Sequence, residues 1–219
     1  MPLLKQQDHK NTLFLLIFFI AFTFSSKAQK ISYGPVIGIV YYHSNNNNGT
    51  QQFLTVDNDN GLKSTINFGA YLEYQLNKRF GLKNQLTFHN KNLTYKLTTV
   101  SYTNTSPTID FTFFDLSSNL KYDFGNGYRK GFYLLFGPRF SFMAKEPSIE
   151  ENIDGTFNKL NIGLQLGIGQ RFLKFIDLQA KLDYGISPFF KSTLESSHNS
   201  SFFGAYLSCN LDLERIINP

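Results

Sequence analysis

The chain has few of the residues that stabilise a protein covalently or anchor it by a helix. Its 219 residues include one cysteine, Cys209, and no tryptophan. One cysteine cannot form an internal disulfide, which excludes a disulfide framework. The longest apolar run, Leu13 to Phe24, has about a dozen residues, whereas a membrane-spanning helix needs about 20. Charged residues make up 17% of the chain and form no basic run, so nucleic acid is not expected as a partner.

The first 28 residues have the order of a secretory signal. Lys5 and Lys10 precede the apolar run, and the small residues Ser26 and Ala28 follow it, just before Gln29. This order predicts a cleaved signal peptide over 1–28 and one exported domain over 29–219. Removing the segment takes away three basic residues and one acidic residue, so 18 basic and 15 acidic residues remain, a net charge of +3.

After Gln29 the apolar residues recur at every second position, the spacing of a strand with two different faces. In one stretch, Leu164 and Leu166 fall on one face, and Gln165 and Gly167 fall on the other. The alternation occurs eight times, and the predicted strands are Ser32–His43, Ser64–Leu76, Phe80–Leu97, Ile109–Phe124, Gly131–Met143, Asn158–Phe172, Phe175–Ser187 and Phe202–Leu213.

The composition of the two faces indicates a barrel that turns its apolar side outward. The apolar rows carry almost no charge over a length that matches the about nine to eleven residues of a tilted membrane-spanning strand. The polar rows are rich in glycine and hold charges of both signs, which can pair inside a narrow lumen. We therefore predict an all-β, eight-stranded antiparallel up-and-down transmembrane β-barrel with a side-chain-filled lumen. The charged residues expected to face inward are Glu73, Lys83, Asp115, Lys121, Asp123, Arg139, Arg171, Lys181, Asp183 and Asp212.

The connections between the predicted strands alternate between short and long. Tight turns follow the second, fourth and sixth strands, and the long polar connections are Ser44–Lys63, Thr98–Thr108, Ala144–Phe157 and Pro188–Ser201. Barrels of the bacterial outer membrane have short periplasmic turns and longer external loops, so the pattern predicts that location.

Aromatic residues gather near the ends of the predicted strands, although their strand propensity alone would place some of them there. They predict two girdles at the membrane surfaces. The girdle at the short turns would contain Tyr74, Phe80, Tyr122, Phe124, Phe132, Phe172 and Phe175. The girdle at the long loops would contain Tyr41, Tyr42, Phe88, Phe142, Phe189, Phe190 and Phe202.

Two predicted strands are irregular. In the third, the apolar residues change parity after Phe88, which predicts either a β-bulge near Asn90–Asn92 or a strand that continues beyond the bilayer. In the fourth, Ser118 interrupts the apolar row, and Phe111 and Phe113 fall on the opposite parity.

Several short patterns together resemble one known family. They are Ser26-Lys27-Ala28-Gln29, the opening strand Tyr33-Gly34-Pro35-Val36-Ile37-Gly38, and Gly137-Pro138-Arg139 in the fifth strand. With the glycine-rich alternation over Gln29 to Leu213, the chain resembles the PorT-like outer-membrane β-barrel proteins of Bacteroidetes. The resemblance implies an eight-stranded barrel with periplasmic termini and, for some members, a link to protein secretion across the outer membrane. Such barrels usually end on an aromatic residue, whereas Arg215 to Pro219 follow the last predicted strand here.

No catalytic constellation stands out, so no catalytic, cofactor-binding or metal-binding residue is predicted. Ser44 and His89 lie near the expected external rim and suggest lipid hydrolysis, but no spacing supports the pair. Two further groups lack the spacing of metal ligands: His43, His89 and Asp57, and the calcium-loop-like Asp57, Asp59 and Gly61.

Three functional hypotheses follow. The preferred one is a non-enzymatic structural or interaction protein. It would contact outer-membrane lipid and bind another envelope or secretion protein through its loops, above all Ser44–Lys63 and Ala144–Phe157, or through its periplasmic rim. The second is an enzyme acting on outer-leaflet lipid, and the third is a soluble ligand-binding barrel with an apolar interior, as in lipocalins.

Overall fold

The computed structural model describes residues 31–46, 54–56, 63–99, 102–103, 108–125, 127–145, 155–192 and 199–217. The predicted signal peptide, 1–28, lies outside the described residues. Eight long strands are present: β1 (Ile31–Asn46), β3 (Lys63–Gln75), β4 (Phe80–Thr99), β6 (Thr108–Asp123), β7 (Phe132–Lys145), β9 (Leu160–Phe172), β10 (Ile176–Gly185) and β12 (Asn199–Leu211). The smaller elements are β2 (Leu54–Val56), β5 (Tyr102–Thr103), β8 (Gly155–Phe157), β11 (Phe190–Ser192) and the helix α2 (Leu213–Ile217).

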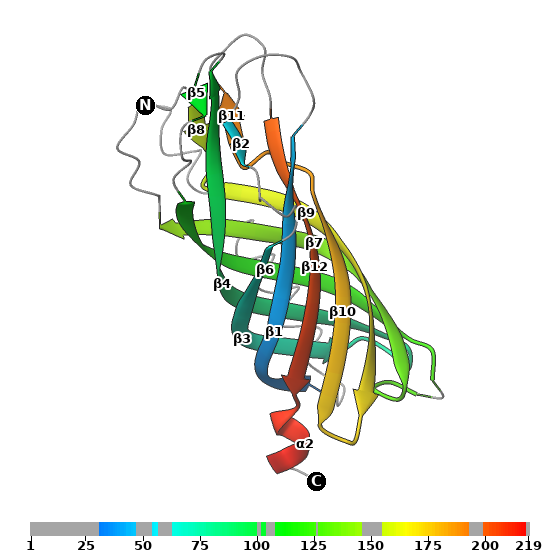
Figure 1. Cartoon of the computed structure of the whole chain (residues 1–219). Helices are drawn as coiled ribbons and strands as arrows, with labels where there is room; N and C mark the ends of the chain where they lie inside the picture. Colours follow the sequence, from blue (N-terminus) through cyan, green and yellow to red (C-terminus); the bar gives the residue numbers. More distant parts are fainter. Residues whose placement is uncertain are drawn as a thin grey trace, which may run out of the picture. The chain divides into compact units, whose positions relative to one another are not determined.

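The eight long strands form a closed antiparallel barrel (Figure 1). Each pairs with the next in chain order, and β1 pairs with β12, with Val36 opposite Asn210 and Asn46 opposite Ser200. Closure leaves no free edge, so the backbone hydrogen bonds of the barrel wall are made between neighbouring strands. The predicted fold class, strand number and up-and-down order are confirmed.

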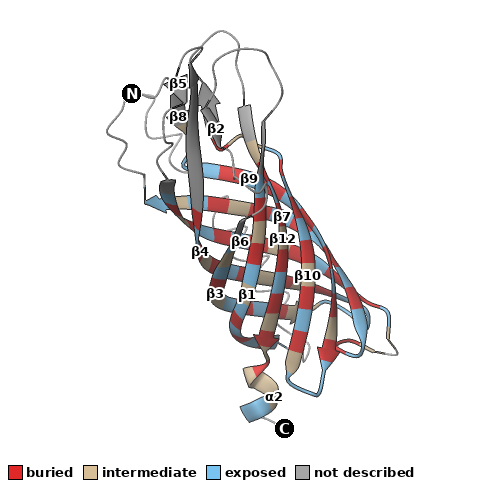
Figure 2. Ribbon diagram, in the orientation of Figure 1, coloured by how far each residue is buried: buried red, intermediate tan, exposed pale blue. Residues whose placement is uncertain are grey.

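Burial alternates along the strands in the sense predicted for a membrane barrel (Figure 2). In β10, the side chain of Leu182 is 54% exposed, whereas that of its neighbour Lys181 is 6% exposed. Apolar side chains therefore form the outer surface and polar side chains fill the lumen. The soluble alternative requires the opposite arrangement, an apolar interior, and is wrong.

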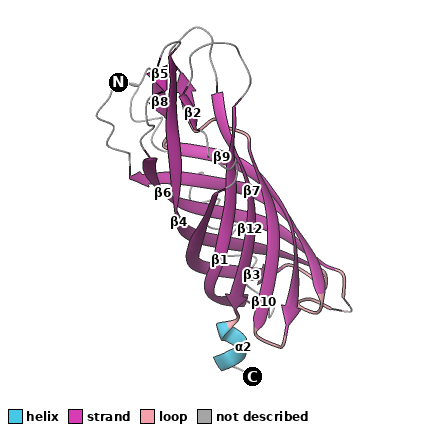
Figure 3. Ribbon diagram, viewed as in Figure 1, coloured by secondary structure: helices cyan, strands magenta, loops and turns pink. Residues whose placement is uncertain are grey.

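The connections also follow the prediction (Figure 3). The described residues of the short turns, at one mouth of the barrel, are 76–79, 124–125, 127–131 and 173–175. At the other mouth β2 and β5 pair with β4, and β11 pairs with β8 and β12. These short strands and α2 were not predicted. Most of the loops Ser44–Lys63 and Ala144–Phe157 lies outside the described residues. In the described part of the chain, no helix has the length and apolar character needed to cross a bilayer.

The irregularity of the third predicted strand comes from its length. The register of β4 against β6 is continuous from Phe80 opposite Tyr122 to Thr94 opposite Thr108. The bulge predicted near Asn90–Asn92 is therefore wrong. The alternative, a strand that continues beyond the bilayer, is confirmed. At about 3.3 Å per residue, the 20 residues of β4 extend well beyond the about 30 Å hydrocarbon core, even with tilt. A register shift occurs instead between β6 and β7, at Thr112 and Phe113.

The girdle prediction is confirmed at the short turns and partly wrong at the loops. Phe80 and Tyr122 pack at 5.0 Å on the outer surface, and Phe124 and Phe132 are exposed beside the turns. On the loop side, Phe142 is exposed as predicted. Three other members point into the lumen and are buried there: Tyr42, Phe189 and Phe202. The side chain of Phe190 lies outside the described residues.

Candidate functional site

The lumen is lined by charged side chains that the strands turn inward. All ten inward charges predicted from the sequence are buried. Lys91, Arg129 and Asp177 are also buried, so the described residues place seven basic and six acidic side chains in the interior, a net charge of +1. Near balance of sign is needed because an unpaired charge in such a site costs several kcal/mol.

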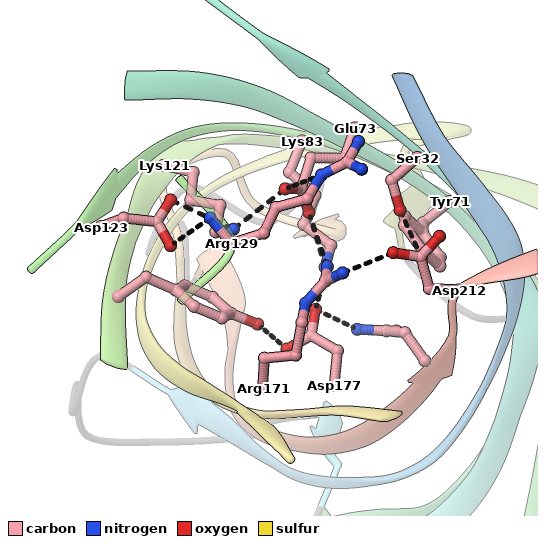
Figure 4. A network of polar contacts seen from close by, with 12 residues as sticks. Ser32, Tyr71, Glu73, Lys83, Lys121, Asp123, Arg129, Arg171, Asp177 and Asp212 are labelled. Atoms are coloured by element: carbon pink, nitrogen blue, oxygen red, sulfur yellow. Dashed lines mark hydrogen bonds and ion pairs between the residues drawn. The ribbon is translucent and has the colours of Figure 1, made fainter. Parts of the chain in front are cut away.

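The layer nearest the short turns is organised around Glu73 (Figure 4). Lys121 Nζ donates to Glu73 Oε1 at 2.9 Å, and Lys83 Nζ lies 3.3 Å from Glu73 Oε2. Arg129 and Arg171 approach the same carboxylate at 3.6 and 3.8 Å. One carboxylate thus holds cations from β4, β6, the β6–β7 turn and β9 across the lumen.

Asp177 in β10 and Asp212, which follows β12, complete this layer on other sides of the barrel. Lys83 Nζ donates to Asp177 Oδ2 at 2.5 Å, and the hydroxyl of Tyr133 also donates to Asp177. Arg171 donates to Asp212. Lys121 also lies over the ring of Tyr133, 4.3 Å from its centroid. These contacts join all sides of the barrel in one network of paired charges.

Amides span the middle of the lumen. Gln85 Nε2 in β4 donates to Gln179 Oε1 in β10 at 3.1 Å and to Asn210 Oδ1 in β12 at 3.2 Å. Lys181 Nζ donates to Gln85 Oε1 at 2.6 Å. Because β4 lies across the barrel from β10 and β12, these bonds fill the central cross-section.

A second ion-paired layer surrounds Arg139. Its Nε donates to Asp183 Oδ1 at 2.8 Å and its Nη2 donates to Asn161 Oδ1 at 2.9 Å. Its Nη1 lies 3.6 Å from Asp115 Oδ1, and Tyr206 donates its hydroxyl to the other oxygen of Asp115 at 3.0 Å. Arg139 is the arginine of the Gly-Pro-Arg pattern. Its fork-shaped guanidinium group binds carboxylates on two walls of the barrel.

Aromatic side chains close the lumen on the loop side. The aromatic plug consists of Val40, Tyr42, Phe111, Phe113, Phe189, Phe202 and Tyr206, with Met143 and Phe157 packed against it. Phe189 stacks on Phe202 at 4.0 Å. Lys91 Nζ lies 4.2 Å from the centroid of Phe202 and 4.9 Å from that of Phe113, which is cation–π geometry. The off-parity Phe111 and Phe113 of the sequence are members of this plug.

The β6–β7 turn closes the lumen at the short-turn mouth. Tyr128 and Arg129 of this turn are buried, and the residue Arg129 has a positive φ of 60°. Lys121 Nζ lies 4.6 Å from the ring centroid of Tyr128, and Arg129 Nη1 donates to Glu214 in α2 at 3.1 Å. The sequence showed only a turn here. Tyr128 and Arg129, which stand between glycines in this turn, were the signal in the sequence that the turn folds into the lumen.

Among the described candidate residues, the structure brings none together as a reactive set. His89 is buried in the lumen beside Asp115, with Nε2 3.7 Å from Oδ2, and it stacks on Phe113. His43 is exposed, and the side chain of Ser44 lies outside the described residues. Asp57, Asp59 and Gly61 also lie outside them. Within the described residues, no group of three His, Cys, Asp or Glu side chains is placed to hold a metal ion.

The apolar outer surface, the closed strand order and the charge-filled lumen define a β-barrel of the bacterial outer membrane. The profile of one family, described as outer membrane protein beta-barrel domain, matches residues 24–191, and the chain belongs to this family. No curated protein matches the chain.

Solved structures of small outer-membrane barrels are similar to the chain. The attachment invasion locus protein Ail of Yersinia pestis, in complex with the heparin analogue sucrose octasulfate, has 10% identity and a TM-score of 0.45, over 83% of this chain and 98% of that one. OprG of Pseudomonas aeruginosa has 11% identity and a TM-score of 0.49, over 84% and 94%. Neisserial surface protein A has 15% identity and a TM-score of 0.38, over 83% and 98%.

Proposed function

We propose that the protein is a closed, non-catalytic barrel that holds a partner-binding surface outside the membrane. The filled lumen is the observation that carries this proposal. Two ion-paired layers, a layer of amides and the aromatic plug occupy successive levels between the mouths. A barrel of eight strands has an interior just wide enough for side chains, and here large side chains from facing strands meet across it.

Among the described residues, the strands extend further at the loop side than at the short turns, which supports a role for the loop side. At the short turns the strands stop at the aromatic girdle: β4 begins at Phe80 and β9 ends at Phe172. At the other mouth β1, β4 and β12 continue past the aromatic plug, and β2, β5, β8 and β11 add to them. In barrels of this class that side faces the cell exterior. The extension therefore offers a strand-built surface outside the bilayer for a partner to bind.

The position of His89 does not suit an enzyme that acts on outer-leaflet lipid. A base that acts on outer-leaflet lipid must reach the outer surface of the barrel, at hydrogen-bond distance from a reacting hydroxyl. His89 points inward under the aromatic plug and is 1% exposed. We therefore propose no catalytic residue.

The finer features of the proposal come from the sequence. Residues 1–28 are a signal peptide removed during export, and the partner that the PorT-like resemblance implies is a component of protein secretion. Mass measurement of the intact protein purified from outer membranes tests the first point, because a mature chain begins at Gln29. A chain that retains residues 1–28 would contradict it.

Conductance and crosslinking test the main proposal. Purified protein reconstituted in planar bilayers should give no steady current steps, and a stable open conductance would contradict the closed lumen. To find the side on which the partner binds, a photo-crosslinking residue replaces either Lys145 at the loop side or Lys174 at the short turns. Both lysines are exposed. In intact cells we expect a protein adduct from position 145. Adducts from position 174 alone would place the binding surface in the periplasm and contradict the proposal.

A further inference from the structure

Two polar side chains interrupt the apolar outer surface of β4 and β6. Asn84 and Ser118 lie opposite each other in the β4–β6 register. Both belong to the outward rows and are half-buried. Their neighbours in those rows are leucines on both sides: Leu82, Leu86, Leu116 and Leu120. The two residues therefore form a polar pair that faces the hydrocarbon.

The polar pair lies midway across the membrane-facing part of these strands. Phe80 packs on Tyr122 at 5.0 Å at the short-turn end, and Phe88 packs on Phe114 at 5.1 Å at the loop end. Asn84 is four residues from both Phe80 and Phe88. The nine residues from Phe80 to Phe88 match the length with which a tilted strand crosses a bilayer, about nine to eleven residues. Asn84 is thus at the centre of the hydrocarbon region.

The pairing of β6 with β7 is interrupted beside the polar pair. Pairing of β6 with β7 runs to Ser117 opposite Arg139 and resumes at Leu120 opposite Phe136. Pro138 falls in this interval and has no N–H to donate. The interruption includes Ser118, so it lies on the same side of the barrel as the two polar side chains.

Polar groups in hydrocarbon gain from any hydrogen-bonding partner that reaches them. Within the described residues, neither the amide of Asn84 nor the hydroxyl of Ser118 has a side-chain hydrogen bond. The amide both donates and accepts, so it is complementary to another copy of itself. Serine has the same property.

We propose that the β4–β6 face is the interface of a homodimer, in which Asn84 and Ser118 of one copy hydrogen-bond the same residues of the second copy. Two copies of an outer-membrane barrel share one orientation in the membrane. A two-fold axis along the membrane normal therefore brings identical residues to the same depth. The exposed Leu86, Leu116 and Leu120 pack around the polar centre, and the ring series Phe68, Phe88 and Phe114 borders it.

Energy transfer between two differently labelled pools of the protein in lipid vesicles tests the dimer. Wild-type protein should show transfer that rises with the protein-to-lipid ratio. The variant Asn84→Leu with Ser118→Leu should need about tenfold more protein per lipid for the same transfer. The matched control is Asn90→Leu, an exposed asparagine in the same outward row but beyond Phe88, and it should behave as wild type. Equal transfer in the double variant and wild type, or wild-type protein that stays monomeric at every ratio, would overturn the proposal.

Crosslinking gives a second test that does not depend on the leucine variant. Cys209 lies on β12, three strands from β4 and four from β6 around the barrel. In vesicles, Asn84→Cys in a Cys209→Ser background should form a disulfide-linked dimer on mild oxidation, whereas wild type, with Cys209 alone, should not. Linkage through Cys209 as efficient as linkage through position 84 would show random collision and overturn the interface. Both proteins are first shown to be folded by heat-modifiable gel mobility.

Discussion

The ring of Tyr133 lies over the backbone of Gly169, its partner in the β7–β9 register, at a place where a Cβ on residue 169 would overlap the ring. Tyr133 is fully buried and its hydroxyl donates to Asp177. The glycine in β9 therefore makes room for a tyrosine that the ion-paired layer requires. Tyr128 covers Gly81 in the same way from the β6–β7 turn.

Gly169→Ala tests this relationship. The added methyl group must displace Tyr133, which weakens its bond to Asp177, and we expect a loss of about 1–3 kcal/mol in the free energy of unfolding. The measurement is urea-induced unfolding of the barrel in lipid vesicles. Gly127→Ala is the control, because the nearest atom to its added Cβ is 3.8 Å away. Equal stability of the two variants would contradict the close contact.

The fold was predictable because a transmembrane strand has a strict period of two. The rows that contain Leu164 and Leu182 have no charge, and the faces of the strands followed from that alone. The same reasoning could not place Tyr42 or Phe202. Each lies near a strand end, where an aromatic side chain is stable both at the membrane surface and inside the lumen. The choice between these places depends on what fills the lumen, which is a tertiary property.

The buried pair of Arg139 and Asp183 gives a second prediction. Arg139→Met leaves Asp183 and Asp115 without their guanidinium partner, and we expect a loss of about 3–5 kcal/mol in the free energy of unfolding. The double variant Arg139→Met, Asp183→Asn removes both charges of the closest pair, at 2.8 Å. Its loss should be smaller than the sum of the two single losses by about 0.5–3 kcal/mol.

The control for this cycle is the exposed Arg79, whose Nη1 donates to the hydroxyl of Tyr122 at 3.1 Å. Arg79→Met should change stability by no more than about 0.5 kcal/mol, because surface substitutions usually have small effects. Strict additivity of the Arg139 and Asp183 variants in vesicle unfolding would show that the two residues do not interact.

Pairing of the lumen charges was only partly predictable. Ten of the buried charges were identifiable by parity, but Glu73 is bound by cations from β4, β6, β9 and the β6–β7 turn. Those contacts depend on strand register and on barrel closure. Arg129 was missed because its turn has no alternation to read. The helix α2, which holds Arg129 through Glu214, was likewise not signalled by a period of two.

Neighbouring phenylalanines in β12 allow a third prediction, about the aromatic plug. Phe202 is 2% exposed and packs between Phe189 and Phe113, whereas Phe203 is 42% exposed on the outer surface. Phe202→Ala removes the centre of the plug and should cost about 3–5 kcal/mol in the free energy of unfolding. Phe203→Ala is the matched control and should cost less, because lipid chains replace the lost contacts.

The same pair of variants also tests closure of the loop-side mouth. A small hydrophilic dye enclosed in vesicles should escape no faster through Phe202→Ala than through wild type, since the ion-paired layers below still fill the lumen. Dye release through Phe202→Ala alone would show that the plug is the main seal and that the charged layers leave a path.

The short turns carry a basic rim next to the aromatic girdle, which leads to the fourth prediction. The rim is defined by the exposed residues Lys78, Arg79, Lys130 and Lys174, which adjoin the outward-facing Phe80, Phe132 and Phe175. Each cation near a bilayer surface attracts anionic lipid by about 1 kcal/mol. Replacing all four by glutamine should reduce the phosphatidylglycerol retained by the barrel in native mass spectrometry, without changing retained phosphatidylethanolamine. Lys145→Gln, at the loop side, is the control. Equal loss in the control and the four-fold variant would show that the rim does not select lipid.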